Sequence, residues 1–166
     1  MNVVIAHNLS PQYASAFTGD ENFLVNFKNC TIADNIFNAV MSLTLPPIEM
    51  ESCIVWGNSG EFVLSNCVAE FSDIQGGWPG PFNITNDPMF ADYGALDYQL
   101  LDGSPCIDVG ASLASVTNDC IGTPRPYGIR WDMGAYEFVP EPCLFIIYNL
   151  LSVIYYRRMK EKGDLF

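Results

Sequence analysis

Aspartates are concentrated after residue 72, and their side chains are the ones best suited to acid–base chemistry. They include Asp73, Asp87, Asp92, Asp97 and Asp102. Two of them at a suitable separation would act as general acid and general base on a glycosidic bond. Such loops could also bind Ca²⁺ through oxygen ligands, but the sequence has no Asp-x-Asp-x-Asp run. Because spacing alone brings no pair together, we assign no catalytic residue, no metal ligand and no cofactor.

Arg125 is one of the few cationic side chains in the first 140 residues, which are rich in acids. The planar guanidinium matches a carboxylate with two parallel hydrogen bonds, which suits it to clamping loops. We therefore expect Arg125 to be buried and paired with a nearby carboxylate, in a structural role and not a catalytic one. The candidate partners are Asp108, Asp119 and Asp132.

The cysteines do not form a metal-binding pattern, because no Cys-x-x-Cys pair occurs and His7 has no cysteine at ligand spacing. Cys106 and Cys120 are 14 positions apart in the C-terminal half, and they are the best disulfide candidates if the protein is exported. Cys30 and Cys53 occupy equivalent positions in an internal repeat. We expect these two to stack as small buried apolar side chains.

That repeat is the strongest indication of how the chain folds. Three stretches align without gaps, at residues 2–8, 29–35 and 52–58, and each has a short β-prone run ending in an asparagine. The asparagines are Asn8, Asn35 and Asn58. Repeats of this length with several short strands predict a parallel β-solenoid, in which like residues superpose and the asparagines form a ladder at one turn. An ordinary β-sandwich is the alternative reading.

Aromatic residues offer a further candidate surface. Trp56, Trp78, Phe71 and Tyr93 would form a strip for stacking on sugar rings, or would instead fill the interiors and corners of the repeats. The second use is the commoner one for aromatic residues in such folds.

The C-terminal half carries a set of short motifs in a fixed order. They are Asp87-Pro88-Met89-Phe90, Ser104-Pro105-Cys106-Ile107-Asp108-Val109-Gly110, Gly122-Thr123-Pro124-Arg125 and Asp132-Met133-Gly134-Ala135-Tyr136-Glu137. Over roughly residues 50–138 this series resembles the C-terminal end of bacterial right-handed parallel β-helix repeat proteins, relatives of the pectate-lyase-like superfamily. The resemblance implies coils over 1–80 and an irregular cap over 81–138 that closes the open end of the last coil. Asp108, Arg125, Asp132 and Glu137 would then be structural residues of the cap.

From residue 139 the composition changes. Pro140-Glu141-Pro142 is followed by an uncharged, largely apolar run over 143–156 and then by Arg157 and Arg158. This order resembles the PEP-CTERM sorting signal of envelope proteins, which implies an apolar helix and a basic anchor within 139–166. At about 1.5 Å per residue the run reaches about 21 Å, short of the ~30 Å hydrocarbon core. A short buried or interfacial helix is therefore the alternative.

The net charge and the first residues of the chain bear on its partners and its location. A formal charge of −12 disfavours a nucleic-acid partner. The first residues have no basic region and no long apolar run, so no signal peptide is recognised, and we interpret the chain as a fragment of a longer exported protein. We expect an all-β, non-enzymatic, surface-anchored module of the cell envelope or extracellular space, structural or adhesive, with extracellular polysaccharide and the membrane or its sorting machinery as partners. The alternative is the C-terminal part of a β-helix polysaccharide lyase or glycoside hydrolase.

Overall fold

The computed structural model describes residues 2–10, 26–37, 47–60, 67–141 and 158, and its elements are short strands. Sheet A has the order β1-β4-β7-β10 and contains β1 (Val4–Ala6), β4 (Thr31–Ala33), β7 (Ile54–Trp56) and β10 (Asp73–Ile74). Sheet B has the order β2-β5-β8 and contains β2 (Leu9–Ser10), β5 (Ile36–Phe37) and β8 (Ser59–Gly60). Sheet C has the order β3-β6-β9 and contains β3 (Asn26–Lys28), β6 (Ile48–Glu51) and β9 (Cys67–Glu70). The fold is all-β.

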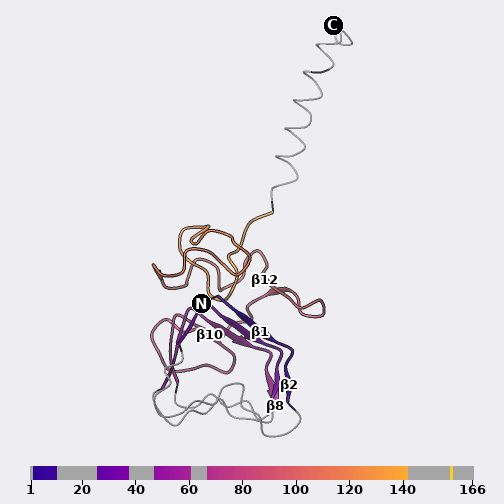
Figure 1. Ribbon diagram of the computed structural model, residues 1–166, viewed down its shortest axis with the longest axis vertical. Coiled ribbons are helices and arrows are strands. Elements are labelled where there is room, and N and C mark those ends of the chain that lie inside the picture. The colour runs from indigo at the N-terminus through magenta and orange to yellow at the C-terminus, as the bar shows by residue number, and fades with distance from the viewer. Residues whose placement is uncertain (1, 11–25, 38–46, 61–66, 142–157, 159–166) are drawn as a thin grey trace.

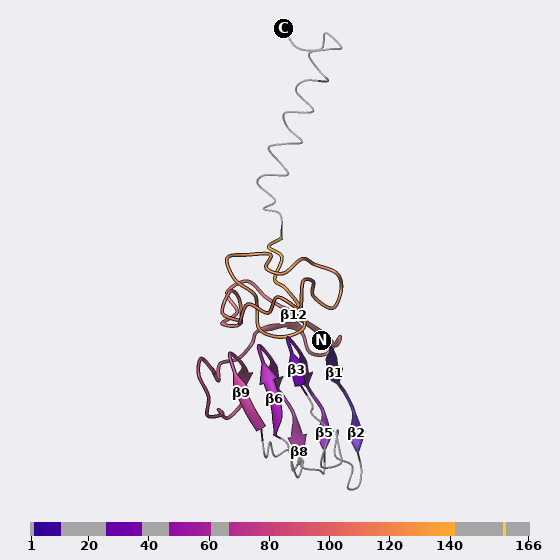
Figure 2. The ribbon, with the colours of Figure 1, turned by 60° about the vertical axis from the view of Figure 1, so that its left-hand side comes forward.

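The chain visits these sheets in the same order each time, from C to A to B, so equivalent strands lie next to one another (Figures 1 and 2). All pairs within the three sheets are parallel. In sheet A, Val4 pairs with Thr31, Thr31 with Ile54, and Ile54 with Asp73. The predicted parallel, in-register pairing of the three repeated stretches is therefore confirmed.

The three repeated asparagines stack at the turn between sheets A and B. The side-chain amide of Asn8 donates to Oδ1 of Asn35 at 2.9 Å, and that of Asn35 donates to Oδ1 of Asn58 at 2.9 Å. The backbone N–H groups of Asn8 and Asn35 donate to the same oxygens. Each asparagine follows a residue with a positive φ, namely His7, Asp34 and Gly57, which makes the sharp turn.

An apolar core lies between sheets A and C. It contains Phe27, Cys30, Ile32, Ile48, Met50, Cys53, Val55, Ala69 and Ile74. Trp78 packs against this core beyond the last strands, and its indole N–H donates to the carbonyl of Cys67 at 3.2 Å. Val3 and Ile5 contact the core at the opposite end and are only partly buried. Among the described residues, Trp78 in the loop that follows β10 therefore packs at the late end of this core.

The repetition continues past residue 80, where we expected it to stop. Ile84 forms a parallel bridge with Asp73, its N–H donates to Ser72 O at 2.9 Å, and its carbonyl accepts from Ile74 N at 3.0 Å. Asn83 supports this added rung by accepting from Ser72 N through its side chain. The short stretch around Ile84 thus forms one further rung on the edge of β10.

Residues 86–138 lie against the outer face of sheet A, which corrects the expectation that they cover the open end of the last coil (Figures 1 and 2). Ala135 N donates to Oγ1 of Thr31 at 3.0 Å, and Gly134 N donates to Ser52 O at 2.8 Å. The amide of Asn29 donates to Asp132 O at 3.1 Å. These bonds lie along the start of the sheet A strands, so the segment covers the side of several repeats. We call residues 86–138 the side cap.

The side cap contains the antiparallel hairpin of β11 (Phe90–Asp92) and β12 (Asp97–Leu100). The remainder of the side cap is loop, held by turns and by side-chain hydrogen bonds to the backbone. The helix expected over 143–156 lies outside the described residues. In the part of the chain that is described, no helix has the length and apolar character needed to cross a membrane.

Candidate functional site

Arg125 lies at the centre of the side cap with its side chain fully buried. Its guanidinium is 2.5 Å from Oε1 of Glu137, and it also donates to the carbonyls of Asp132 at 3.2 Å and Gly134 at 2.8 Å. The expected burial is thus observed, but the paired carboxylate belongs to Glu137 and not to Asp108, Asp119 or Asp132. The turn over 132–134 directs its carbonyls at the guanidinium, so Asp132 contributes its backbone and Glu137 contributes the charge.

Three further acids near Arg125 accept backbone N–H groups. Asp132 accepts from Asp108 N at 2.7 Å and from Phe138 N at 2.5 Å, while Asp119 accepts from Thr123 N at 2.7 Å. Asp108 in turn accepts from Arg130 N at 2.7 Å. Burial raises the pKa of Asp132 to about 6, although its N–H donors oppose the rise. These contacts hold loops in place, which is a structural role.

A second buried acid joins the side cap to sheet A. Asp73 on β10 is fully buried, and its Oδ2 accepts from the thiol of Cys106 at 3.2 Å. Burial raises the pKa of Asp73 to about 6 and also raises that of Cys106. Asp73 Oδ1 has no hydrogen-bond partner among the residues that the structure describes. The buried thiol is therefore a weak donor to this carboxylate and not a nucleophile.

The predicted disulfide between Cys106 and Cys120 is not formed in the structure, where both are thiols. Cys106 is fully buried and bonded to Asp73, whereas Cys120 is exposed. The physical reason is that the two side chains face different surroundings, one toward sheet A and the other toward solvent.

Four of the five acids that we considered for catalysis close turns or hold the fold, and the fifth, Asp102, is exposed. Asp87 accepts from Met89 N, Asp92 from Gly94 N, and Asp97 from Gln99 N, at 2.8–3.1 Å. Such contacts are typical of aspartate in tight turns. Among the described residues, no group of three or more His, Cys, Asp or Glu side chains could hold a metal ion.

The four aromatic residues do not gather in one strip, and three of them pack against apolar clusters, which is the commoner use named above. Trp78 packs on the core between sheets A and C, whereas Trp56 of sheet A and Tyr93 of the side cap pack on the cluster between that sheet and the cap. Phe71 stacks instead on Phe82, with ring centroids 4.5 Å apart and an interplanar angle of 20°.

Phe82 was missed by sequence reasoning, and its side chain is 70% exposed. Phe71 and Phe82 both have a positive φ, of 50° and 59°, which is rare for bulky residues. They occupy the turn position that Asn29 and Ser52 hold in earlier repeats, since Phe82-Asn83-Ile84 continues the pattern of Phe71-Ser72-Asp73. The recurrence of a phenylalanine followed by a small polar residue, at positions 71–72 and 82–83, was the feature of the sequence that could have identified Phe82.

A groove of about 510 Å³ lies where the chain leaves the side cap. Its lining includes Asp97, Asp102, Leu101, Phe138, Pro140 and Glu141. Pro140 and Glu141 of the predicted sorting signal are exposed here, and Arg158 is exposed as well. Pro142 and Arg157 lie outside the described residues. The groove thus places two residues of the predicted signal at the surface.

Comparison of the chain with protein-family models, with curated proteins and with solved structures finds no match.

Proposed function

We propose that this chain is the C-terminal part of a right-handed parallel β-helix and that it acts as a non-enzymatic structural or adhesive module. The observation that carries the proposal is the in-register stack of strands with its asparagine ladder. In such a stack each repeat supports the next, which yields a stiff, elongated body suited to presenting a surface. The acids of the side cap support this role, since their oxygens are engaged by backbone N–H groups.

Polysaccharide is the proposed partner, and the stacked pair of Phe71 and Phe82 is the proposed contact. Phe82 presents a ring that is mostly exposed, and Phe71 supports that ring from below. A flat aromatic face packs well against the C–H face of a sugar ring. Phe71 is itself packed against the apolar cluster that includes Trp131, so the pair has a firm base.

The test is binding of the whole chain to a panel of soluble and insoluble polysaccharides, measured by affinity electrophoresis and pull-down. Phe82→Ala should weaken binding at least tenfold without shifting the melting temperature, because the ring is mostly in water. Ile129→Ala is the matched control, since Ile129 is 88% exposed and lies in the side cap. Equal binding by parent and Phe82→Ala would exclude this contact, and shortening of a polysaccharide would favour the lyase or hydrolase alternative.

The location that we propose is the cell envelope, with residues 139–166 as a sorting or anchoring segment. The support is the order of Pro140-Glu141-Pro142, the apolar run and the two arginines. The test fuses residues 138–166 to a soluble reporter that carries an export signal. Retention in the membrane that is lost when Arg157 and Arg158 become Glu would support the segment. A soluble, unprocessed reporter would count against it.

A further inference from the structure

Two cysteines lie one above the other in successive repeats, at the position just before the strands of sheet A. Thr31 pairs with Ile54 in register, so Cys30 is opposite Cys53. The backbone around them is held on both sides, because Cys30 O accepts from Ile54 N at 2.9 Å and Cys53 O from Asp73 N at 2.8 Å. Neighbouring parallel strands lie about 4.8 Å apart. That spacing falls within the range of Cα separations found for disulfides, about 4.4–6.8 Å.

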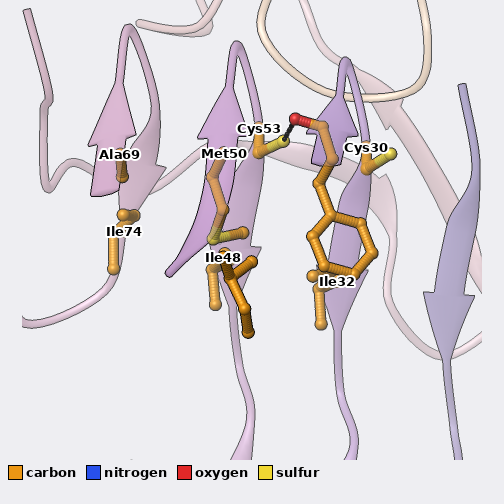
Figure 3. Close-up of a cluster of buried hydrophobic side chains, with 9 residues drawn as sticks. Cys30, Ile32, Ile48, Met50, Cys53, Ala69 and Ile74 are labelled. Atoms are coloured by element: carbon orange, nitrogen blue, oxygen red, sulfur yellow. Dashed lines mark hydrogen bonds between the residues drawn. The ribbon is translucent and has the colours of Figure 1, made fainter. Parts of the chain in front are cut away.

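Both side chains point into the same core (Figure 3). Cys30 is 1% exposed and Cys53 is fully buried, and both belong to the cluster between sheets A and C. The structure holds them as thiols. A hydrogen bond from the Cys53 side chain lowers the pKa of Cys30 to about 7, whereas burial raises the pKa of Cys53. The two side chains are therefore neighbours in successive repeats, and their thiols donate to the backbone carbonyls of Lys28 at 3.3 Å and of Phe27 at 3.5 Å.

The other described cysteines lack such a neighbour. Cys67 lies on β9 of sheet C, opposite Ile48. Cys106 donates to Asp73, and Cys120 is exposed on the side cap. In the next repeat the position equivalent to Cys53 is occupied by Ser72, which is also fully buried. Among the described residues, the sulfur pair is thus confined to two repeats, and the same position holds a hydroxyl in the repeat that follows them.

We propose that Cys30 and Cys53 form a disulfide that links successive repeats when the chain folds in an oxidising compartment. The oxidant is an external disulfide, either of a small thiol compound or of a thiol oxidoreductase. The Cys30 thiolate attacks one of its sulfurs and releases one thiolate. The thiol of Cys53 then loses its proton and attacks the Cys30 sulfur of the mixed disulfide, releasing the second external thiolate. Two protein thiols and one external disulfide thus become one protein disulfide and two external thiols.

Because both sulfurs are buried in the folded protein, the exchange has to take place during folding. At 1% and 0% exposure they are out of reach of an oxidant in the folded protein. The exchange therefore belongs to the folding chain, before the core between sheets A and C closes. Once formed, the bond would be equally hard to reach for a reductant.

The experiment refolds the whole chain in a glutathione buffer with excess oxidised form and, in parallel, in excess dithiothreitol. Exposed thiols are alkylated, and the protein is cleaved after glutamate without reduction. Cleavage places Cys30 in residues 22–49, Cys53 in 52–61 and Cys67 in 62–70, so each partner is identified by mass. We expect a cross-linked 22–49/52–61 product only after oxidation. We also expect a melting temperature higher by on the order of 5–10 °C than that of the reduced protein.

Two serine variants complete the design. Cys30→Ser should abolish both the cross-link and the oxidation-dependent rise in melting temperature, and Ser72 shows that a hydroxyl fits at this position. Cys120→Ser is the matched control and should retain both. Oxidised parent protein with Cys30 and Cys53 in separate peptides, or cross-linked to other cysteines, would overturn the proposal. Because that mapping uses the parent chain, it decides the matter even if Cys30→Ser fails to fold.

Discussion

Sheets A and C belong to the same repeats but have different outer faces. On sheet A, the outward-facing Thr31, Ala33 and Ile54 are all buried, because the side cap covers them. On sheet C, the outward-facing Glu49 and Val68 are exposed. The inner strands of sheet A are therefore buried on both faces, whereas those of sheet C alternate between buried and exposed residues. The comparison shows that in this repeat the burial of a strand depends on a segment that comes later in the sequence.

The largest expected effect comes from removing the ion pair that organises the side cap. Arg125→Ala would leave the buried carboxylate of Glu137 without its partner, which costs about 3–5 kcal/mol. The measurement is the free energy of unfolding from urea denaturation. An unfolding midpoint equal to that of the parent would show that the side cap does not depend on this pair.

A smaller effect is expected where the side cap touches sheet A most closely. A Cβ at Gly134, where φ is +87°, would lie 2.7 Å from Cδ1 of Ile54 and 2.9 Å from Oγ1 of Thr31. Gly134→Ala should therefore cost about 2–4 kcal/mol, from backbone strain and from overpacking. Gly103→Ala is the control, since its φ is +83° and nothing lies within 4 Å. It should cost about 1 kcal/mol, and equal losses at both sites would mean that the close contact is unimportant.

The buried acid of sheet A, Asp73, should make the stability of the protein depend on pH. Burial raises the pKa of Asp73 to about 6, above its unfolded value of about 3.9. The folded state thus favours the protonated acid, so this stabilisation is fully present below about pH 4 and is lost as pH rises through 6. Between pH 7.5 and pH 5 the parent should gain on the order of 1–2 kcal/mol more than Asp73→Asn does.

The measurement is thermal or urea unfolding of both proteins at the two pH values. Asp102→Asn is the matched control, because Asp102 is exposed, and it should behave as the parent does. If the stability of Asp73→Asn changed with pH as much as that of the parent, the pH dependence would not come from Asp73.

The smallest effect is expected on the exposed face of sheet C. Lys28 and Glu51 pair across adjacent strands at 3.5 Å, and their side chains are 37% and 33% exposed. Ion pairs in such surroundings contribute little, because water screens them. Glu51→Gln should change the free energy of unfolding by less than about 1 kcal/mol. If Glu51→Gln lowered the free energy of unfolding as much as Arg125→Ala does, the outer faces of sheets A and C would be equally important for stability.

The sequence was sufficient to predict the three repeats in which equivalent positions carry residues of the same type. The β-branched residues Ile5, Ile32 and Val55 recur at equivalent positions, and an asparagine follows each of them three residues later, so the parallel register could be predicted. The later rungs were missed because the spacing shortens, from 27 and 23 residues to 19 and then 11. Near-constant spacing is what makes a repeat visible in a sequence.

The site was predicted less completely than the fold. The burial of Arg125 could be predicted because it is one of few cations in a segment rich in acids. Its pairing with Glu137 and not with a nearby aspartate depends on how the 132–134 turn directs its carbonyls, which the sequence does not show. The surface covered by the side cap depends on contacts such as that of Gly134 with Thr31 and Ile54. Such contacts between distant segments leave no local pattern in composition or spacing.

The bonds between the side cap and the first repeats join residues far apart in the chain. Asn29 and Asp132 are separated by 103 positions, and Thr31 and Ala135 by 104. During synthesis or export from the N-terminus, the outer face of sheet A would stay uncovered until the side cap emerges. Contacts of such long range slow folding and leave apolar surface exposed to other chains. A ribosome or export channel that releases this chain slowly would therefore expose an aggregation-prone face until the side cap has been released.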